Sequence, residues 1–142
     1  MKRGATSLAV CTLLATQAVA APQPLSMDQS SGTLMDAATS AKIWHDNVPA
    51  RVSKLYPSGK FRFASDVTGG FNDAKTCVVS ARAMLLPVIL LPIQGRKVVY
   101  APVKAATAFD AVGSLTQAQC QEVARTKLKE AIQSLTTALA AG

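Results

Sequence analysis

The stretch of residues 76–103 places the strongest limits on how this chain folds. It carries the densest apolar run after the N-terminal segment, and Cys77 stands near its start. From residue 76 to residue 86 the side chains sort into two sets at the two-residue period of a β-strand. One set is wholly apolar and the other is mixed; the apolar set is Cys77, Val79, Ala81, Ala83 and Leu85. The pattern predicts a strand with one face on a core and the other face partly covered.

Residues 87–93 are apolar at every position, so the alternation stops there. Such a run is either covered on both faces or forms a binding surface. The uncharged stretch 83–93 is too short for a membrane-spanning helix, which needs about 20 residues. Pro87 and Pro92 would lack N–H groups on opposite sides of an unbroken strand, so we expect a bend or break between them.

Gln94 and Gly95 predict a tight turn into a second strand over residues 96–103. Arg96 and Lys97 would then flank the tip of this hairpin. The apolar run and the basic tip together form a candidate surface for a partner or ligand. Its members are Met84, Leu86, Val88, Ile89, Leu90, Leu91, Ile93, Arg96 and Lys97. Three interpretations stay open: a covered sheet face, a surface for self-association or a partner, and a site for a lipid or another apolar ligand.

Residues 1–20 are typical of a secretory signal peptide. Lys2 and Arg3 give the positive start, residues 5–15 a short and mostly apolar core, and small residues precede a cleavage site after Ala20. We therefore expect a periplasmic or secreted protein with no membrane span after cleavage.

Two cysteines, Cys77 and Cys120, remain once the signal peptide with Cys11 is removed. An even pair in an exported chain predicts a disulfide. By the entropy of loop closure, this bond would stabilise the fold by about 4 kcal/mol. Two separated cysteines and the single histidine, His45, lack the spacing of a zinc site, so no metal or other cofactor is expected.

Cleavage leaves 122 of the 142 residues, enough for one domain with a modest core. The formal charge of +7 falls to about +5 because Lys2 and Arg3 are lost. The remaining charges form no block, which indicates a mildly basic surface or, alternatively, attraction to an anionic envelope or an acidic partner.

The segment 21–32 is rich in Pro, Ser and Gln and has no apolar period, so we expect a flexible leader. A helix is predicted over residues 33–47, with Asp36 in its first turn. Its apolar stripe would be Leu34, Ala37, Ala38, Ala41 and either Ile43 or Trp44. Pro49 either ends this helix or starts a second, short one.

Residues 60–68 alternate as a half-buried strand, with Phe61 and Phe63 on its core side. Residues 69–73 supply the turn into the central strand. Residues 105–114 carry only weak signals.

Thr116 and Gln119 fit a capping box at the start of a long C-terminal helix. The apolar stripe of this helix is Cys120, Val123, Ala124, Leu128, Ala131, Leu135 and Leu139. Cys120 on this stripe and Cys77 on the central strand would pin the helix across the sheet.

Residues 33–142 are therefore predicted to form a single α+β domain. We expect two layers: an antiparallel meander of three to four strands, an N-terminal helix or helix pair, and a long C-terminal helix, with one disulfide.

The sequence offers few groups for catalysis. His45 would have to serve any Ser or Cys triad, and Asp66 and Asp73 flank a turn where aspartate is common for local reasons. We predict a non-enzymatic binding protein of the bacterial cell envelope, such as an inhibitor, an immunity-type protein or an adaptor. The alternative is a carrier or sensor of an apolar ligand, or a membrane-surface protein, that uses residues 84–93. The expected partner is another envelope protein or a second copy of the chain; a peripheral membrane contact stays open, and nucleic acid is not expected.

Overall fold

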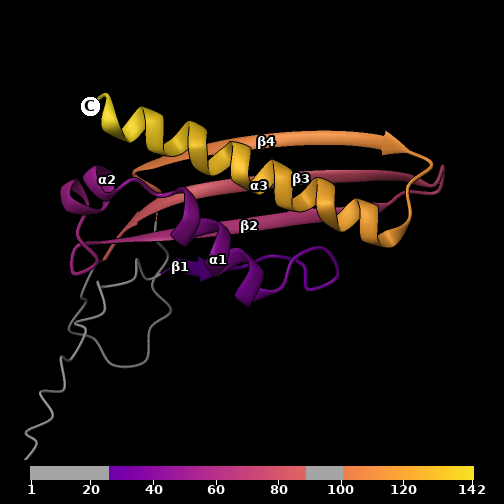
Figure 1. The fold of residues 1–142 in the computed structure, drawn as a ribbon, viewed down its shortest axis with the longest axis horizontal. Helices are drawn as coiled ribbons and strands as arrows, with labels where there is room; N and C mark the ends of the chain where they lie inside the picture. Colours follow the sequence, from indigo (N-terminus) through magenta and orange to yellow (C-terminus); the bar gives the residue numbers. More distant parts are fainter. Residues whose placement is uncertain (1–25, 89–100) are drawn as a thin grey trace, which may run out of the picture.

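The computed structural model describes residues 26–88 and 101–142. Four strands and three helices follow one another along these residues (Figure 1). They are β1 (Ser26–Asp28), α1 (Ala37–Asn47), α2 (Ala50–Leu55), β2 (Phe61–Phe71), β3 (Thr76–Pro87), β4 (Lys104–Gly113) and α3 (Gln117–Ala140). The predicted α+β class is confirmed, with the N-terminal helix pair and the long C-terminal helix.

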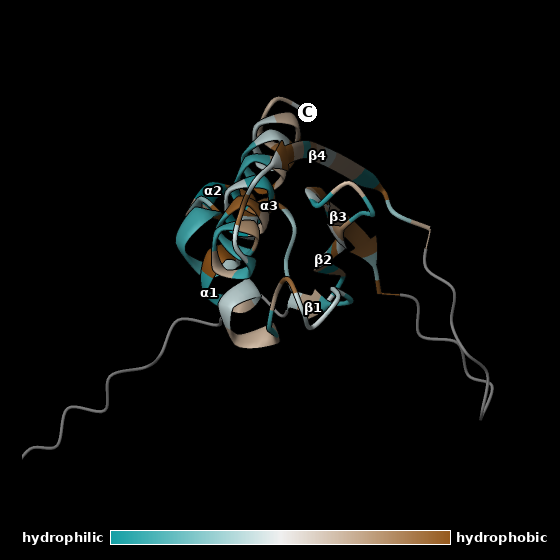
Figure 2. Ribbon diagram, turned by 90° about the vertical axis from the view of Figure 1, so that its right-hand side faces the viewer, coloured by the Kyte–Doolittle hydropathy of each residue, from teal (hydrophilic) through white to brown (hydrophobic). Residues whose placement is uncertain are grey.

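The four strands form one sheet in the order β1-β2-β3-β4. β2, β3 and β4 make the predicted antiparallel meander, and β1 adds a parallel strand beside β2, so the sheet is mixed. All three helices lie on one face of the sheet (Figure 2). We call this the inner face and the opposite one the outer face.

The inner face holds the main core, as the alternation in β3 predicted. Cys77, Val79, Ala81, Ala83 and Leu85 are all fully buried. On β2, the ring of Phe63 packs against Trp44 of α1 with their centroids 5.1 Å apart. Phe63 is thus a core residue, and Phe61 is half-buried against the same core, on the side expected.

The long helix α3 begins at the predicted capping box. The Thr116 side chain accepts from the Gln119 N–H, and the Gln119 side chain accepts from the Thr116 N–H at 2.8 Å. The predicted stripe faces the sheet, joined by Ile132 and Thr136. The predicted disulfide is present between Cys77 and Cys120, whose Cα atoms are 5.7 Å apart. It ties the first turn of α3 to the start of β3.

The stripe predicted for the first helix is wrong in part. α1 begins after Asp36, which serves as N-cap, and Ala37, Ala38 and Ala41 are exposed. The buried residues of α1 are Ser40 and Trp44. The Trp44 indole N–H and the Ser40 hydroxyl both reach the Ser65 hydroxyl of β2, at 3.1 and 2.8 Å, so a polar residue holds a core position there. Pro49 starts α2, the second of the two alternatives.

Strand β1 lies within residues 21–32, which we expected to be a flexible leader; residues 21–25 lie outside the described part. The Ser31 N–H donates to the Val67 carbonyl at 2.8 Å, and the Val67 N–H donates to the Ser30 hydroxyl at 2.9 Å. Main-chain and side-chain bonds therefore hold this segment along the edge of β2.

The strand predicted over residues 96–103 can be compared with the structure only at its last three residues. Residues 96–100 lie outside the described part, and residues 101–103 form no strand. The second neighbour of β3, beside β2, is β4, a stretch with only weak sequence signals. Its inward residues include Ala106 and Ala108, whose small side chains give little contrast with the outward ones.

β2 also runs further than predicted, through Gly69 and Gly70 to Phe71. Gly69 has φ +129°, and a Cβ there would lie 2.0 Å from the Val78 carbonyl oxygen. Only glycine allows the two strands of this hairpin to approach so closely at that position.

Candidate binding site at the β4 edge

The predicted partner surface lies only partly in the described residues. Met84 and Leu86 are buried on the outer face, where they pack with Ala64 and the half-buried Met27. Val88 is half-buried, and its N–H donates to the Lys60 carbonyl at 2.8 Å. The other predicted members, Ile89, Leu90, Leu91, Ile93, Arg96 and Lys97, lie outside the described residues. The structure thus brings together Met84 and Leu86 and leaves the rest of this prediction untested.

The titratable residues considered for catalysis lie on three separate elements. His45 is on the exposed side of α1, with its Nδ1 3.2 Å from an oxygen of Asp46. Asp66 is on β2, opposite Arg82 of β3, and Asp73 is in the turn between these strands. Within residues 26–88 and 101–142, no three His, Cys, Asp or Glu side chains are grouped to hold a metal ion. The same residues contain no helix that is both long and apolar enough to cross a membrane.

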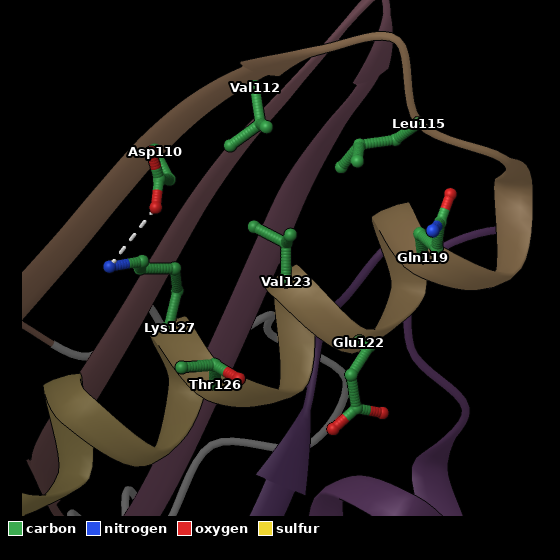
Figure 3. A pocket seen from close by; sticks show the side chains of 8 residues that line it. All are labelled: Asp110, Val112, Leu115, Gln119, Glu122, Val123, Thr126 and Lys127. Carbon is green, nitrogen blue, oxygen red and sulfur yellow. Dashed lines mark ion pairs between the residues drawn. The ribbon is translucent and has the colours of Figure 1, made fainter.

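A groove lies between β4 and the N-terminal half of α3. It has a volume of about 320 Å³. The apolar side chains of Val112, Leu115 and Val123 converge in it from the strand, the following loop and the helix (Figure 3). The other lining residues are Asp110, Gln119, Glu122, Thr126 and Lys127. A groove with apolar walls and a polar rim suits an apolar side chain whose backbone runs along the rim.

An ion pair closes one end of this groove. The Lys127 amine lies 3.3 Å from an Asp110 oxygen (Figure 3). The same amine lies 2.9 Å from a Glu130 oxygen. The hydrogen bond that Lys127 donates to Glu130 and, less strongly, the one that it donates to Asp110 raise the pKa of Lys127 above its ordinary value. The amine is therefore charged at neutral pH and fixes the Asp110 carboxylate at the edge of the sheet.

The backbone of β4 turns a row of polar groups toward the side of the sheet away from β3. The Ala111 N–H donates to the Oδ1 of Asp110 at 2.9 Å. In a strand, N–H and C=O groups point to alternate sides from one residue to the next. Ala105, Thr107 and Phe109 therefore also direct these groups away from β3. β4 is an edge strand in the described sheet, so this row is open to a further strand.

The side chains of β4 leave the centre of this edge without the usual protection. Natural edge strands are guarded by proline, bulges or charged side chains, including charged side chains that point inward. β4 contains no proline, and its two charged residues, Lys104 and Asp110, lie on the inner face on either side of the uncharged residues 105–109. On the outer face, Phe109 is 62% exposed, among the most exposed of the large apolar side chains in the described residues. The centre of the edge is thus uncharged and carries an exposed aromatic ring.

Comparison with protein-family models, with curated proteins and with solved structures gave no match to this chain.

Sequence reasoning missed this site because it missed β4. One signal was present: Phe109 and Val112 stand out among small residues, and they lie three apart, on opposite faces of a strand. That spacing indicates a strand with apolar side chains on both faces, but two such residues are too few to predict how the strand pairs with its neighbour.

Proposed function

We propose that this chain is an exported interaction protein and that a strand of another polypeptide pairs with its β4 edge. One observation carries the proposal: within residues 26–88 and 101–142, β4 is an edge strand with an uncharged centre, and it runs beside an apolar groove. Main-chain groups along such an edge supply affinity, and the groove supplies selectivity, as in other proteins that bind by strand addition.

The two faces of the edge support this mode over simple docking into the groove. The groove of Val112, Leu115 and Val123 is on the inner face, and Phe109 is exposed on the outer face. The side chains of one added strand alternate between the faces. A single strand would therefore fill the groove with one set of side chains and cover Phe109 with the other.

Export is part of the proposal. The signal-like residues 1–20 and the Cys77–Cys120 disulfide both suit an oxidising compartment outside the cytoplasm. A binding role also suits the sequence, which offers a single histidine and no catalytic motif. The setting that fits these features is the bacterial cell envelope or the medium around the cell.

Photo-crosslinking in the producing cell tests the proposal. A photoreactive side chain replaces Ala105, at the exposed edge, and in a matched protein it replaces Lys54, on the exposed surface of α2. We expect crosslinked products from position 105 and none from position 54. Thr107→Pro in the first protein should abolish them, because proline removes an N–H that points to the added strand. Thr107→Val, which keeps the N–H, should retain them.

Products that persist with Thr107→Pro, or that form equally from both positions, would contradict strand addition at β4. The mass of a product identifies the joined polypeptide, which separates a second copy of the chain from a different protein.

A further inference from the structure

We infer that the strand added to β4 is β4 of a second copy of this chain, which gives a two-fold symmetric dimer with a continuous eight-stranded sheet. This inference rests on the proposed function, because it names the partner of the same edge. It follows from the register in which two β4 strands can pair.

The direction of the backbone groups limits that register. The groups of Ala105, Thr107, Phe109 and Ala111 point outward in both copies, as argued from the Ala111 N–H. In an antiparallel pair, residues of this outward set must lie opposite one another to exchange both hydrogen bonds. Odd-numbered residues therefore face odd-numbered residues, and only every second offset of the two strands is allowed.

Charge selects among the allowed offsets. When Thr107 faces Phe109 of the second copy, Lys104 of that copy faces Val112 and lies diagonally next to Asp110. Opposite charges at such cross-strand positions are favourable. When Phe109 instead faces Phe109, the two Asp110 carboxylates become diagonal neighbours, which is unfavourable.

A third register, with Thr107 facing Thr107, places Lys104 directly opposite Asp110. It leaves Ala111 without a partner, however, because the Val103 N–H that would face it already donates to the Leu85 carbonyl. The first register pairs all four outward residues and keeps the attraction between Lys104 and Asp110, so it is preferred.

The same register accounts for the exposed ring. Phe109 of each copy faces Thr107 and lies diagonally next to Phe109 of the other copy. Diagonal neighbours are within reach of aromatic side chains. The most exposed large side chain of the strand is then covered on the outer face by its own symmetry mate.

Asp110 can change its hydrogen-bond partner when two β4 strands pair. In the single chain its Oδ1 accepts from the Ala111 N–H and its Oδ2 lies 3.3 Å from the Lys127 amine. In the dimer the Ala111 N–H donates to the Ala105 carbonyl of the second copy. Oδ1 is then released and can accept from Lys104 of that copy.

The helices fit this arrangement. α3 packs across β3 and β4, so its axis lies near the line between them. Strands are about 4.8 Å apart, which puts α3 about 5 Å from the two-fold axis and the two α3 helices about 10 Å apart. Packed helices are 8–10 Å apart. The C-terminal half of α3 carries the small residues Ser134, Thr137 and Ala138, which permit this approach beside the groove of the other copy.

The oligomeric state of the mature chain, measured by light scattering over a range of concentrations, is the first test. We expect a dimer that dissociates on dilution. Thr107→Pro removes the two symmetric Thr107 N–H donors and should raise the dissociation constant by at least about tenfold. Thr107→Val keeps both donors and should leave the constant within a few-fold of the parent. Circular dichroism of the proline variant verifies that its fold is retained.

An engineered crosslink tests the register without relying on loss of binding. In the preferred register Ala108 faces Ala108 of the second copy as a pair without mutual hydrogen bonds, where Cβ atoms are close. Ala108→Cys should therefore give a covalent dimer on mild oxidation. Ala105→Cys is the matched control, since residue 105 faces residue 111 and should not crosslink to itself.

A monomer at every concentration, a dimer that Thr107→Pro does not weaken, or crosslinking by Ala105→Cys but not by Ala108→Cys would each overturn the inference. A monomer whose β4 edge crosslinks to a different protein in the cell would overturn the dimer and leave the proposed function standing. A monomer with no crosslinked product at that edge would overturn both.

Discussion

Ser65 joins three elements through a single hydroxyl. Its oxygen accepts from the Trp44 indole N–H at 3.1 Å, lies 2.8 Å from the Ser40 hydroxyl, and is 3.4 Å from a carboxylate oxygen of Asp28. Ser65→Ala leaves the Trp44 N–H without its partner in a fully buried place. We expect the free energy of unfolding to fall by about 1–3 kcal/mol, measured by urea denaturation.

Ser80→Ala is the matched control for that measurement. Ser80 is also a strand serine, but it is half-buried on the outer face of β3. Its replacement should change stability by less than about 0.5 kcal/mol. Equal effects of the two substitutions would show that the hydroxyl of Ser65 does not hold β1, β2 and α1 together.

The stability that Asp36 gives to the folded chain, as the N-cap of α1, depends on pH. The Thr39 hydroxyl, and after it the Thr39 N–H, donates to the Asp36 carboxylate and lowers its pKa below the ordinary 3.8. The folded chain therefore favours the charged form, and this stabilisation is present above pH 3.8 and is lost as the pH falls through the lowered pKa.

A pair of variants isolates this effect. At neutral pH Asp36→Ala should lower the melting temperature, and Asp36→Asn should lower it much less, because asparagine also caps helices. As the pH falls below 3.8, the difference between the parent and Asp36→Ala should shrink, whereas the difference between Asp36→Asn and Asp36→Ala should stay. Melting curves in acid in which the parent keeps its full advantage over Asp36→Ala would contradict this role of the carboxylate.

At the scale of elements, the disulfide decides how firmly α3 is held on the sheet. It joins residues 43 apart in sequence, and both cysteines are fully buried. Replacing both at once, Cys77→Ala with Cys120→Ala, should lower the free energy of unfolding by about 4 kcal/mol because the unfolded chain gains freedom. Urea denaturation measures the loss, and a double variant as stable as the parent would show that packing alone holds α3.

Sequence patterns predicted the elements whose two faces differ strongly in hydrophobicity. α3 has a capping box and a stripe of large apolar residues, and β3 alternates cleanly, so both are confirmed with their faces. The stripe of α1 failed because a serine took a core position: Ser40 is buried only because Ser65 lies 2.8 Å away on another element. Contacts between distant residues of that kind leave no local pattern.

β4 and β1 show the same limit in strands. The inward residues of β4 include two alanines, whose burial comes from α3 and β3 and not from their own hydrophobicity. β1 has three residues, too few for a period, and it is held by Asp28 and Ser30 through bonds to β2. The candidate site depends on β4, so the sequence alone placed it elsewhere, in residues 84–97.

On the scale of the whole molecule, the described residues form a two-layer body with an uncharged strand edge at β4. The inner face of the sheet is buried under three helices and pinned by the disulfide, and β4 lies at one edge of the sheet (Figure 1). The residues of β4 other than Lys104 and Asp110 are uncharged, and the outward backbone groups of this strand offer hydrogen bonds to a partner strand. We therefore expect the outward N–H groups of β4 to become paired when the protein binds its partner.

Amide hydrogen exchange, resolved by residue with NMR, measures whether these N–H groups are paired. The N–H groups of Ala106 and Ala108 point to β3 and should exchange slowly at any concentration. Those of Thr107 and Phe109 should exchange quickly in dilute solution and slow markedly as the concentration rises and the added strand forms. Fast exchange of Thr107 and Phe109 at every concentration, and also in protein purified together with any crosslinked partner, would contradict strand addition at β4.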